Sequence, residues 1–158
     1  MKTPTVGADE RDNAATVVHG ILTNIFSLSN TMVGGQYIFS GTKTDTASFT
    51  LDDATNPTVA TYGGNSSEFA VKTGKDTNIS VGHDGDAVFS DLFDTLIDLK
   101  GYLESNDTAG IGTSMDELDI DFSTITNKIA EIGAKDVRID TRENVIADLN
   151  LRYEANQS

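Results

Sequence analysis

The chain has 158 residues, no cysteine, and 25 acidic against 11 basic side chains, which give a formal net charge of -14 at pH 7. Such a length allows one domain with a substantial core, or a helical body carrying a small insert, and argues against two large domains. The acidic balance argues against nucleic acids and anionic membranes as partners, and the missing cysteine excludes disulfides, thiolate metal sites and cysteine nucleophiles.

A helix is predicted from about Asp9 to Val33. Apolar side chains recur there at intervals of three and four residues, the pattern of a helix with one buried face. They are Ala15, Val18, Leu22, Ile25, either Leu28 or Ser29, and Met32. The tandem Gly34–Gly35 would supply the positive φ with which this helix stops.

The next segment, residues 37–81, predicts a small antiparallel sheet. Residues 58–62 and 68–72 alternate apolar and polar side chains, as half-buried strands do. Residues 63–65 would turn the first of these strands into the second, and residues 73–76 would close a hairpin with 78–81.

Helical periodicity returns after Asp86 and predicts a second helix that ends between Glu104 and Asp107. Residues 110–113 then read as a loop. Thr113 or Ser114 is a plausible N-cap for a third helix, with Glu117 placed for a capping box. This third helix would run from Asp116 to Ala155, a rod of about 60 Å.

The third helix carries apolar residues at near-heptad spacing, and such a seam needs partners along its full length. The seam is formed by Phe122, Ile125, Ile129, Ile132, Ile139, Ile146, Leu149 and Tyr153. We expect the first helix to cover part of it and the chain to be the middle of a longer polypeptide. The candidate helix-packing or subunit-interface residues are Ile125, Ile129, Ile132, Gly133, Ala134, Ile139, Ile146 and Leu149, with the glycine and alanine permitting close approach.

No pattern of reactive side chains predicts an enzyme, a cofactor or a metal site. His19 and His83 lack metal-site spacing, and residues 83–86 begin a calcium loop without completing it. Four acidic side chains could form a metal site or an acid–base pair, but carboxylates also favour the first turns of a helix. We therefore expect this cluster to be a solvated face. It consists of Asp116, Glu117, Asp119 and Asp121.

Three segments resemble the hook-associated protein 3 family, the hook–filament junction proteins related to flagellin. The first is residues 30–46, with Asn-Thr, a glycine pair and Tyr-Ile-Phe-Ser-Gly-Thr-Lys-Thr-Asp-Thr. The second is Asp-Ala-Val-Phe-Ser-Asp-Leu-Phe at residues 86–93, and the third is Gly-Ala-Lys-Asp-Val-Arg-Ile-Asp at residues 133–140. The Gly-Ala signature is shared with filament flagellins, whereas the first segment favours the junction proteins.

The resemblance implies a structural subunit of the bacterial flagellum, an adaptor at the hook–filament junction, exported by the flagellar type III route and located outside the cell. It implies self-assembly and, as partners, the other junction protein, hook subunits or filament flagellin, and an export chaperone. The family's terminal assembly helices are absent, so we expect this central fragment to be monomeric. The rival readings are filament flagellin, a calcium-binding adhesin and an acid-dependent hydrolase.

The predicted fold class is α+β. An elongated antiparallel helical bundle would form from residues 1–36 and 86–158, and a small antiparallel β domain would be inserted at residues 37–85.

Overall fold

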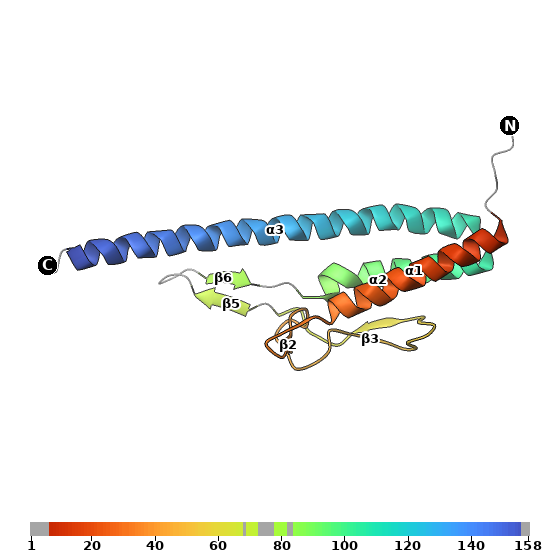
Figure 1. The fold of residues 1–158 in the computed structure, drawn as a ribbon, viewed down its shortest axis with the longest axis horizontal. Coiled ribbons are helices and arrows are strands. Elements are labelled where there is room, and N and C mark those ends of the chain that lie inside the picture. The colour runs from red at the N-terminus through yellow and green to blue at the C-terminus, as the bar shows by residue number, and fades with distance from the viewer. Residues whose placement is uncertain (1–6, 68, 73–77, 82–83, 156–158) are drawn as a thin grey trace, which may run out of the picture.

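A computed structural model of the chain describes residues 7–67, 69–72, 78–81 and 84–155 (Figure 1). The described residues form three helices: α1 spans Ala8–Ser29, α2 spans Asp86–Ser105 and α3 spans Thr108–Ala155. The strands between α1 and α2 are short. They are β1 Met32–Val33, β2 Gln36–Tyr37, β3 Phe49–Leu51, β4 Ala60–Tyr62, β5 Phe69–Lys72 and β6 Asn78–Val81.

Each helix runs antiparallel to the next helix in the chain, and α2 packs against both α1 and α3 (Figure 1). At 48 residues α3 is about 70 Å long, and it extends well beyond the end of α2. None of the helices in the described residues is long and apolar enough to cross a membrane. The predicted α+β class, an elongated helical bundle with small antiparallel strands, is confirmed.

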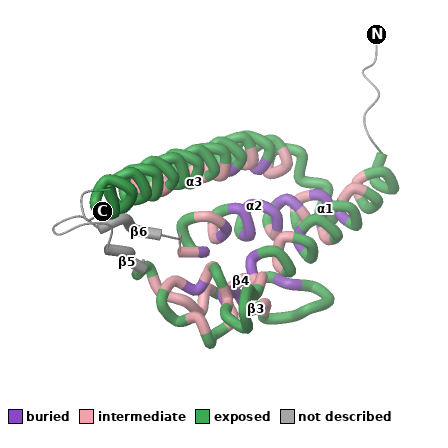
Figure 2. The backbone as a smooth tube through the Cα atoms, turned by 60° about the vertical axis from the view of Figure 1, so that its left-hand side comes forward, coloured by how far each residue is buried: buried purple, intermediate pink, exposed green. Residues whose placement is uncertain are grey.

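The core lies between α1, α2 and the β3–β4 pair. Its fully buried centre is formed by Leu22 of α1, Phe93 of α2 and Phe49 of β3, each at most 1% exposed. The Phe49 ring lies 4.9 Å from the Phe93 ring and 5.2 Å from the Tyr62 ring, measured between centroids. Figure 2 shows that burial is concentrated on α1, α2 and the segment around β3 and β4, whereas most of α3 is exposed.

The prediction that the first helix continues to Val33 is wrong, because α1 ends at Ser29 and residues 32–33 form a strand. Gly34 and Gly35 do have positive φ, 60° and 82°, but they form the two-residue turn of the β1–β2 hairpin. Positive φ at both central residues matches the twist of a tight hairpin. Met32, predicted on the buried stripe, is 50% exposed.

The predicted sheet is instead three separate two-stranded antiparallel pairs. β3 was not predicted from the sequence. β4 pairs with β3 rather than with β5, so residues 63–65 do not connect paired strands. Burial of Phe49 against α2 fixes where β3 lies, and β4 follows it. The β5–β6 hairpin is confirmed, although residues 73–76 of its predicted turn lie outside the described part of the chain.

The third helix begins earlier than predicted, at Thr108, and includes residues 110–113. The Asp107 carboxylate accepts hydrogen bonds from the backbone N–H groups of Ala109 and Gly110, at 3.0 and 3.1 Å. These bonds satisfy donors that have no partner inside the helix, so Asp107 is the N-cap. The connection from α2 to α3 is therefore only Asn106 and Asp107, and Ser114 lies inside the helix with a buried side chain.

Candidate functional site

The junction between α1 and the strands is held by the side chain of Asn30. Its amide nitrogen donates to the carbonyl of Phe49, and its amide oxygen accepts from the N–H of Phe49, both at 3.0 Å. One side chain thus binds both backbone groups of a residue in β3, as a neighbouring strand would. The sequence motif that begins at Asn30 therefore fixes the end of α1 against the strands.

The Ser-Gly step of the same motif is a buried, hydrogen-bonded turn. The Ser40 hydroxyl donates to the carbonyl of Thr46 at 2.6 Å and lies 2.9 Å from the Ser48 hydroxyl, and both serines are fully buried. Gly41 has a φ of 61°, and a Cβ placed on it would lie 2.0 Å from the carbonyl oxygen of Asn65. Only glycine fits this backbone and this space.

The aromatic part of the motif connects the turn to the start of α2. The carbonyl of Phe39 accepts from the N–H of Gly85 at 2.7 Å and from the Tyr62 hydroxyl at 3.0 Å. The Phe39 ring meets the Phe89 ring of α2 edge-on, with centroids 5.0 Å apart. Burial raises the pKa of Tyr62, and the nearby Asp84 and Asp86 carboxylates add to the effect. The motif therefore builds a corner and carries no pair of nucleophile and base.

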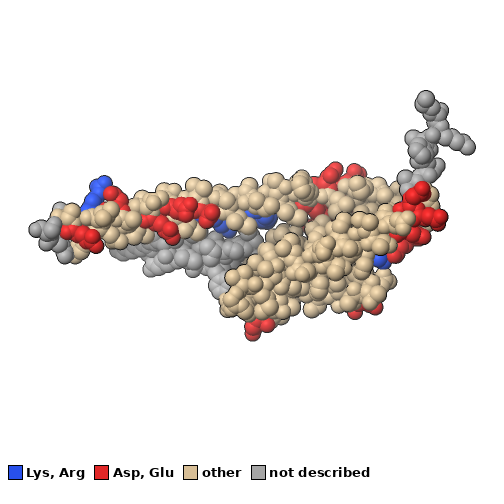
Figure 3. Space-filling view, viewed as in Figure 1, with Lys and Arg blue, Asp and Glu red and all other residues tan. Residues whose placement is uncertain are grey.

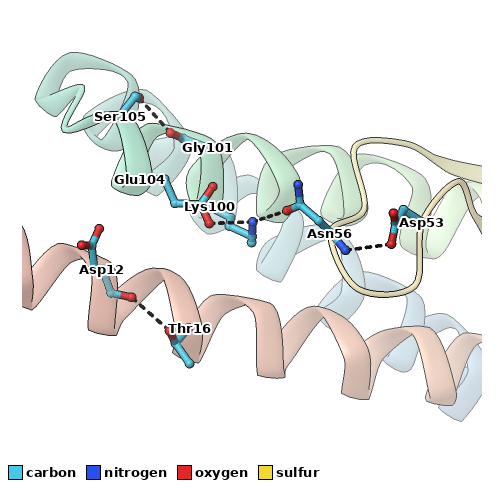
Figure 4. A network of polar contacts seen from close by, with 8 residues as sticks. All are labelled: Asp12, Thr16, Asp53, Asn56, Lys100, Gly101, Glu104 and Ser105. Atoms are coloured by element: carbon cyan, nitrogen blue, oxygen red, sulfur yellow. Dashed lines mark hydrogen bonds and ion pairs between the residues drawn. The ribbon is translucent and has the colours of Figure 1, made fainter.

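Charged side chains fasten the loop before β4 to α2 (Figure 4). The Lys100 ammonium lies 2.6 Å from the amide oxygen of Asn56 and 2.7 Å from the Glu104 carboxylate. Asn56 in turn donates its backbone N–H to the Asp53 carboxylate at 3.1 Å. This network explains why a loop without regular structure lies against the helix.

The predicted interface residues are spread along an uncovered rod. Ile125 is partly buried and packs on the core, and Ile139 is half-buried. The others are exposed: Ile129 64%, Ile132 52%, Ile146 52% and Leu149 57%, together with Gly133 and Ala134. A Cβ added to Gly133 would have no atom within 4 Å, so no helix of the described chain approaches it. Their role in packing stays a prediction.

The α3 face that meets α2 has a seven-residue repeat that differs slightly from the predicted seam. Ile111, Leu118 and Ile125 pack on the core, and the same spacing continues through Ile132, Ile139, Ile146 and Tyr153. Phe122 and Ile129, predicted on the seam, lie off this line, and Phe122 is 73% exposed. The helix covering the first part of the seam is α2, rather than α1 as predicted.

Two polar side chains on α3 are also buried, each three residues after an apolar residue of this repeat. Ser114 and Asp121 are seven residues apart and only 0% and 7% exposed. The expectation that Asp116, Glu117, Asp119 and Asp121 all face solvent is therefore wrong for Asp121, because the register of α3 on α2 turns that position inward. The burial of Asp121 could not be predicted from the apolar pattern, because a polar residue does not contribute to that pattern.

The other candidate residues are two histidines and Asp84. His19 is half-buried, with its Nδ1 unpartnered, and His83 lies outside the described residues. Asp84 caps α2 by accepting from the N–H of Ala87 at 2.8 Å. Within the described residues no group of three histidine or acidic side chains is placed to hold a metal ion. Figure 3 shows acidic side chains along α3 and at the tip where α1 begins.

Comparisons with known proteins agree with this architecture. Over 89 residues the sequence is 30% identical to flagellar hook-associated protein 3 of Escherichia coli K12. This chain is similar to flagellar hook-associated protein 3. The match covers 56% of the chain and 26% of that relative, so the chain spans about a quarter of the length of the curated relative. The family resemblance seen in the sequence is confirmed. No protein-family model matches the chain.

Two solved structures show the fold. The first is the structure of a Vibrio parahaemolyticus protein that is assigned as a flagellar hook-associated protein. It has a TM-score of 0.83 at 19% identity, and the match covers 97% of this chain and 70% of that one. FlgL of Bacillus cereus has a TM-score of 0.76 at 22% identity, covering 91% and 70%. The long α3, the shorter helices and the small strands are therefore an arrangement that solved structures share.

Proposed function

We propose that this chain is part of a structural subunit of the bacterial flagellum, the adaptor at the hook–filament junction. The sequence match to flagellar hook-associated protein 3 carries the proposal. The packed corner supports it, because the residues that the sequence motif supplies are the ones that fasten α1, the strands and α2 together.

The assembly surface in this proposal is the second half of α3. Its isoleucines recur every seven residues at Ile132, Ile139 and Ile146, and two of these three side chains are more than half exposed. Repeats of this spacing pack against other helices. Leu149 extends the surface, and Gly133 and Ala134 would permit close approach of the partner helix.

The remaining parts of the proposal are what the family resemblance of the sequence implies. The parent protein would act without catalysis, assemble with copies of itself, and contact the other junction protein and either hook subunits or filament flagellin. It would be exported with the help of a chaperone and located outside the cell. The 158-residue chain itself is expected to be monomeric, and light scattering at micromolar concentration tests this.

Immunogold electron microscopy tests the location. An antibody raised against this chain is applied to cells of the source organism, with cells lacking the parent gene as the control. We expect gold in a narrow band between hook and filament. Label along the entire filament would instead make the parent a flagellin, and label away from flagella would favour an adhesin or an enzyme.

A further inference from the structure

A groove between α2 and α3 is lined by carboxylates from both helices. It has a volume of about 300 Å³ and is lined by Asp91, Asp94, Thr95, Asp98, Glu117, Ile120 and Asp121. Five of the seven lining side chains are acidic, and none of the seven is basic. The two helices therefore meet across an accumulation of like charge.

Asp121 makes this groove different from an ordinary solvated acidic surface. The residue is only 7% exposed, and its Oδ2 is buried without a hydrogen-bond partner. It lies seven residues after Ser114, on the face of α3 that packs on α2. A cation bound beside this oxygen would supply the partner that the oxygen lacks.

The neighbouring carboxylates supply no positive partner for Asp121. Burial raises the pKa of Asp94, and the charges of Asp98 and Asp91 add to the effect. The ion pairs of the described residues nearest in sequence involve Lys100 and Lys128, which bond to Glu104 and Glu131 outside the groove. The negative charge in the groove is thus uncompensated by the described side chains.

We propose that this groove binds a hydrated divalent cation of the Mg²⁺ class, which bridges α2 and α3. Asp121 would bind from α3, and Asp94 or Asp98 would bind from α2. Mg²⁺ usually keeps several of its waters and uses only one or two carboxylates, so the site does not need three converging protein ligands. The volume of the groove leaves room for those waters. This inference does not depend on the flagellar assignment.

Thermal unfolding of the whole chain, followed by circular dichroism at pH 7.5, tests the proposal. With MgCl₂ at ten times the dissociation constant, the Tm should rise by about 3–6 °C above its value in NaCl of equal ionic strength. Asp121→Asn should raise the metal-free Tm and abolish the Mg²⁺ increment. Asp119→Asn, an exposed acid on the same helix, is the matched control and should keep the increment.

A second measurement locates the ion independently of stability. Mn²⁺ prefers similar oxygen ligands and broadens nearby NMR signals, so trace Mn²⁺ should broaden amides near residues 94–98 and 117–121 in the intact chain and leave the Asp121→Asn spectrum sharp. If Asp121→Asn does not fold, Asp98→Asn together with Asp94→Asn takes its place. Equal effects of NaCl and MgCl₂, a Tm that responds only to acid, or an increment that survives in the variant would overturn the proposal.

Discussion

Gly41 has a left-handed backbone and faces the carbonyl of Asn65, so any side chain there is both strained and obstructed. Gly41→Ala should lower the free energy of unfolding by about 1–3 kcal/mol. Gly20→Ala is the control, because Gly20 lies in α1 with nothing within 4 Å of an added Cβ. It should stabilise the chain by up to about 1 kcal/mol. Urea unfolding of both variants measures the difference, and equal effects would contradict the role given to Gly41.

Two aspartates have opposite effects on stability as the pH changes. Asp52 accepts hydrogen bonds from the Thr58 hydroxyl and from the N–H groups of Thr58 and Val59, which hold its pKa well below the usual range. Its contribution is present above the unfolded pKa of about 3.8 and is lost as the pH falls below that value. Asp94, whose pKa is raised, opposes folding at neutral pH and ceases to do so when it is protonated.

We therefore expect protonation of Asp94 to raise the urea midpoint as the solution is acidified from pH 7, and protonation of Asp52 to lower the midpoint below pH 4. Asp94→Asn should raise the midpoint at pH 7 and change it little at pH 3. Asp52→Asn should lower it at pH 7 and reduce the loss below pH 4. If both variants shifted the midpoint equally at every pH, neither carboxylate would be responsible.

For single residues, the sequence indicated that the segment 30–46 is important but did not predict which contacts its side chains make. Asn30, Ser40 and Gly41 stand in the motif that was singled out, but their bonds reach Phe49, Thr46 and Asn65, residues that only the folded chain brings near. Asp121 was misplaced for a related reason. A polar residue on a packed face breaks the apolar pattern from which the face is predicted.

The N-cap of α3 is Asp107 in the structure, whereas the sequence predicted Thr113 or Ser114, and two variants distinguish Asp107 from Thr113. Asp107→Ala should lower the free energy of unfolding by about 1 kcal/mol, since it removes the acceptor for two N–H groups of the first turn. Thr113→Ala should change it by less than about 0.5 kcal/mol, because Thr113 is exposed and bonds only to the carbonyl of Ala109 in the preceding turn. Thermal unfolding compares the two, and the reverse order would restore Thr113 as the cap.

The exposed half of α3 should matter for assembly rather than for folding. Ile132→Asp should change the stability of the isolated chain by less than about 0.5 kcal/mol, because the side chain is 52% exposed. Carried by the parent protein, the same change should abolish swimming in soft agar. Phe122→Asp is the control: it alters an exposed apolar residue that lies off the seven-residue repeat, and motility should persist. Loss of motility in both variants would argue against a specific seam.

The position of α2 was predictable from the sequence and that of β3 was not, for a physical reason. A helix of 20 residues repeats its apolar pattern several times, so α2 could be bounded to within a few residues. β3 has three residues, and its position depends on Phe49 packing against α2 rather than on alternation. The glycine pair after α1 predicted positive φ correctly, but a helix end and a hairpin turn both use that conformation.

Phe49 decides whether the whole molecule unfolds as one body. Its side chain is 1% exposed and lies among Phe89, Phe93 and Tyr62, so one core joins the strands to α2. Phe49→Ala should lower the free energy of unfolding by about 3–5 kcal/mol. We expect the helical signal at 222 nm and the amide protection of β3 and β4 to be lost together, at the same lowered temperature.

The sequence-based division predicts something different, because an inserted domain at residues 37–85 could unfold while α1, α2 and α3 stay folded. Val59→Ala is the control for surface effects in the same segment, since Val59 is 50% exposed and should shift the transition by less than about 0.5 kcal/mol. If the Phe49→Ala variant is too unstable to purify, Phe49→Leu allows the same comparison with a smaller loss of unfolding free energy. Helices that kept their original transition while the β3–β4 amides exchanged freely would establish residues 37–85 as an independent unit. Simultaneous loss would show that the strands are part of the helical body, as a corner built from Asn30, Phe39 and Phe49 requires.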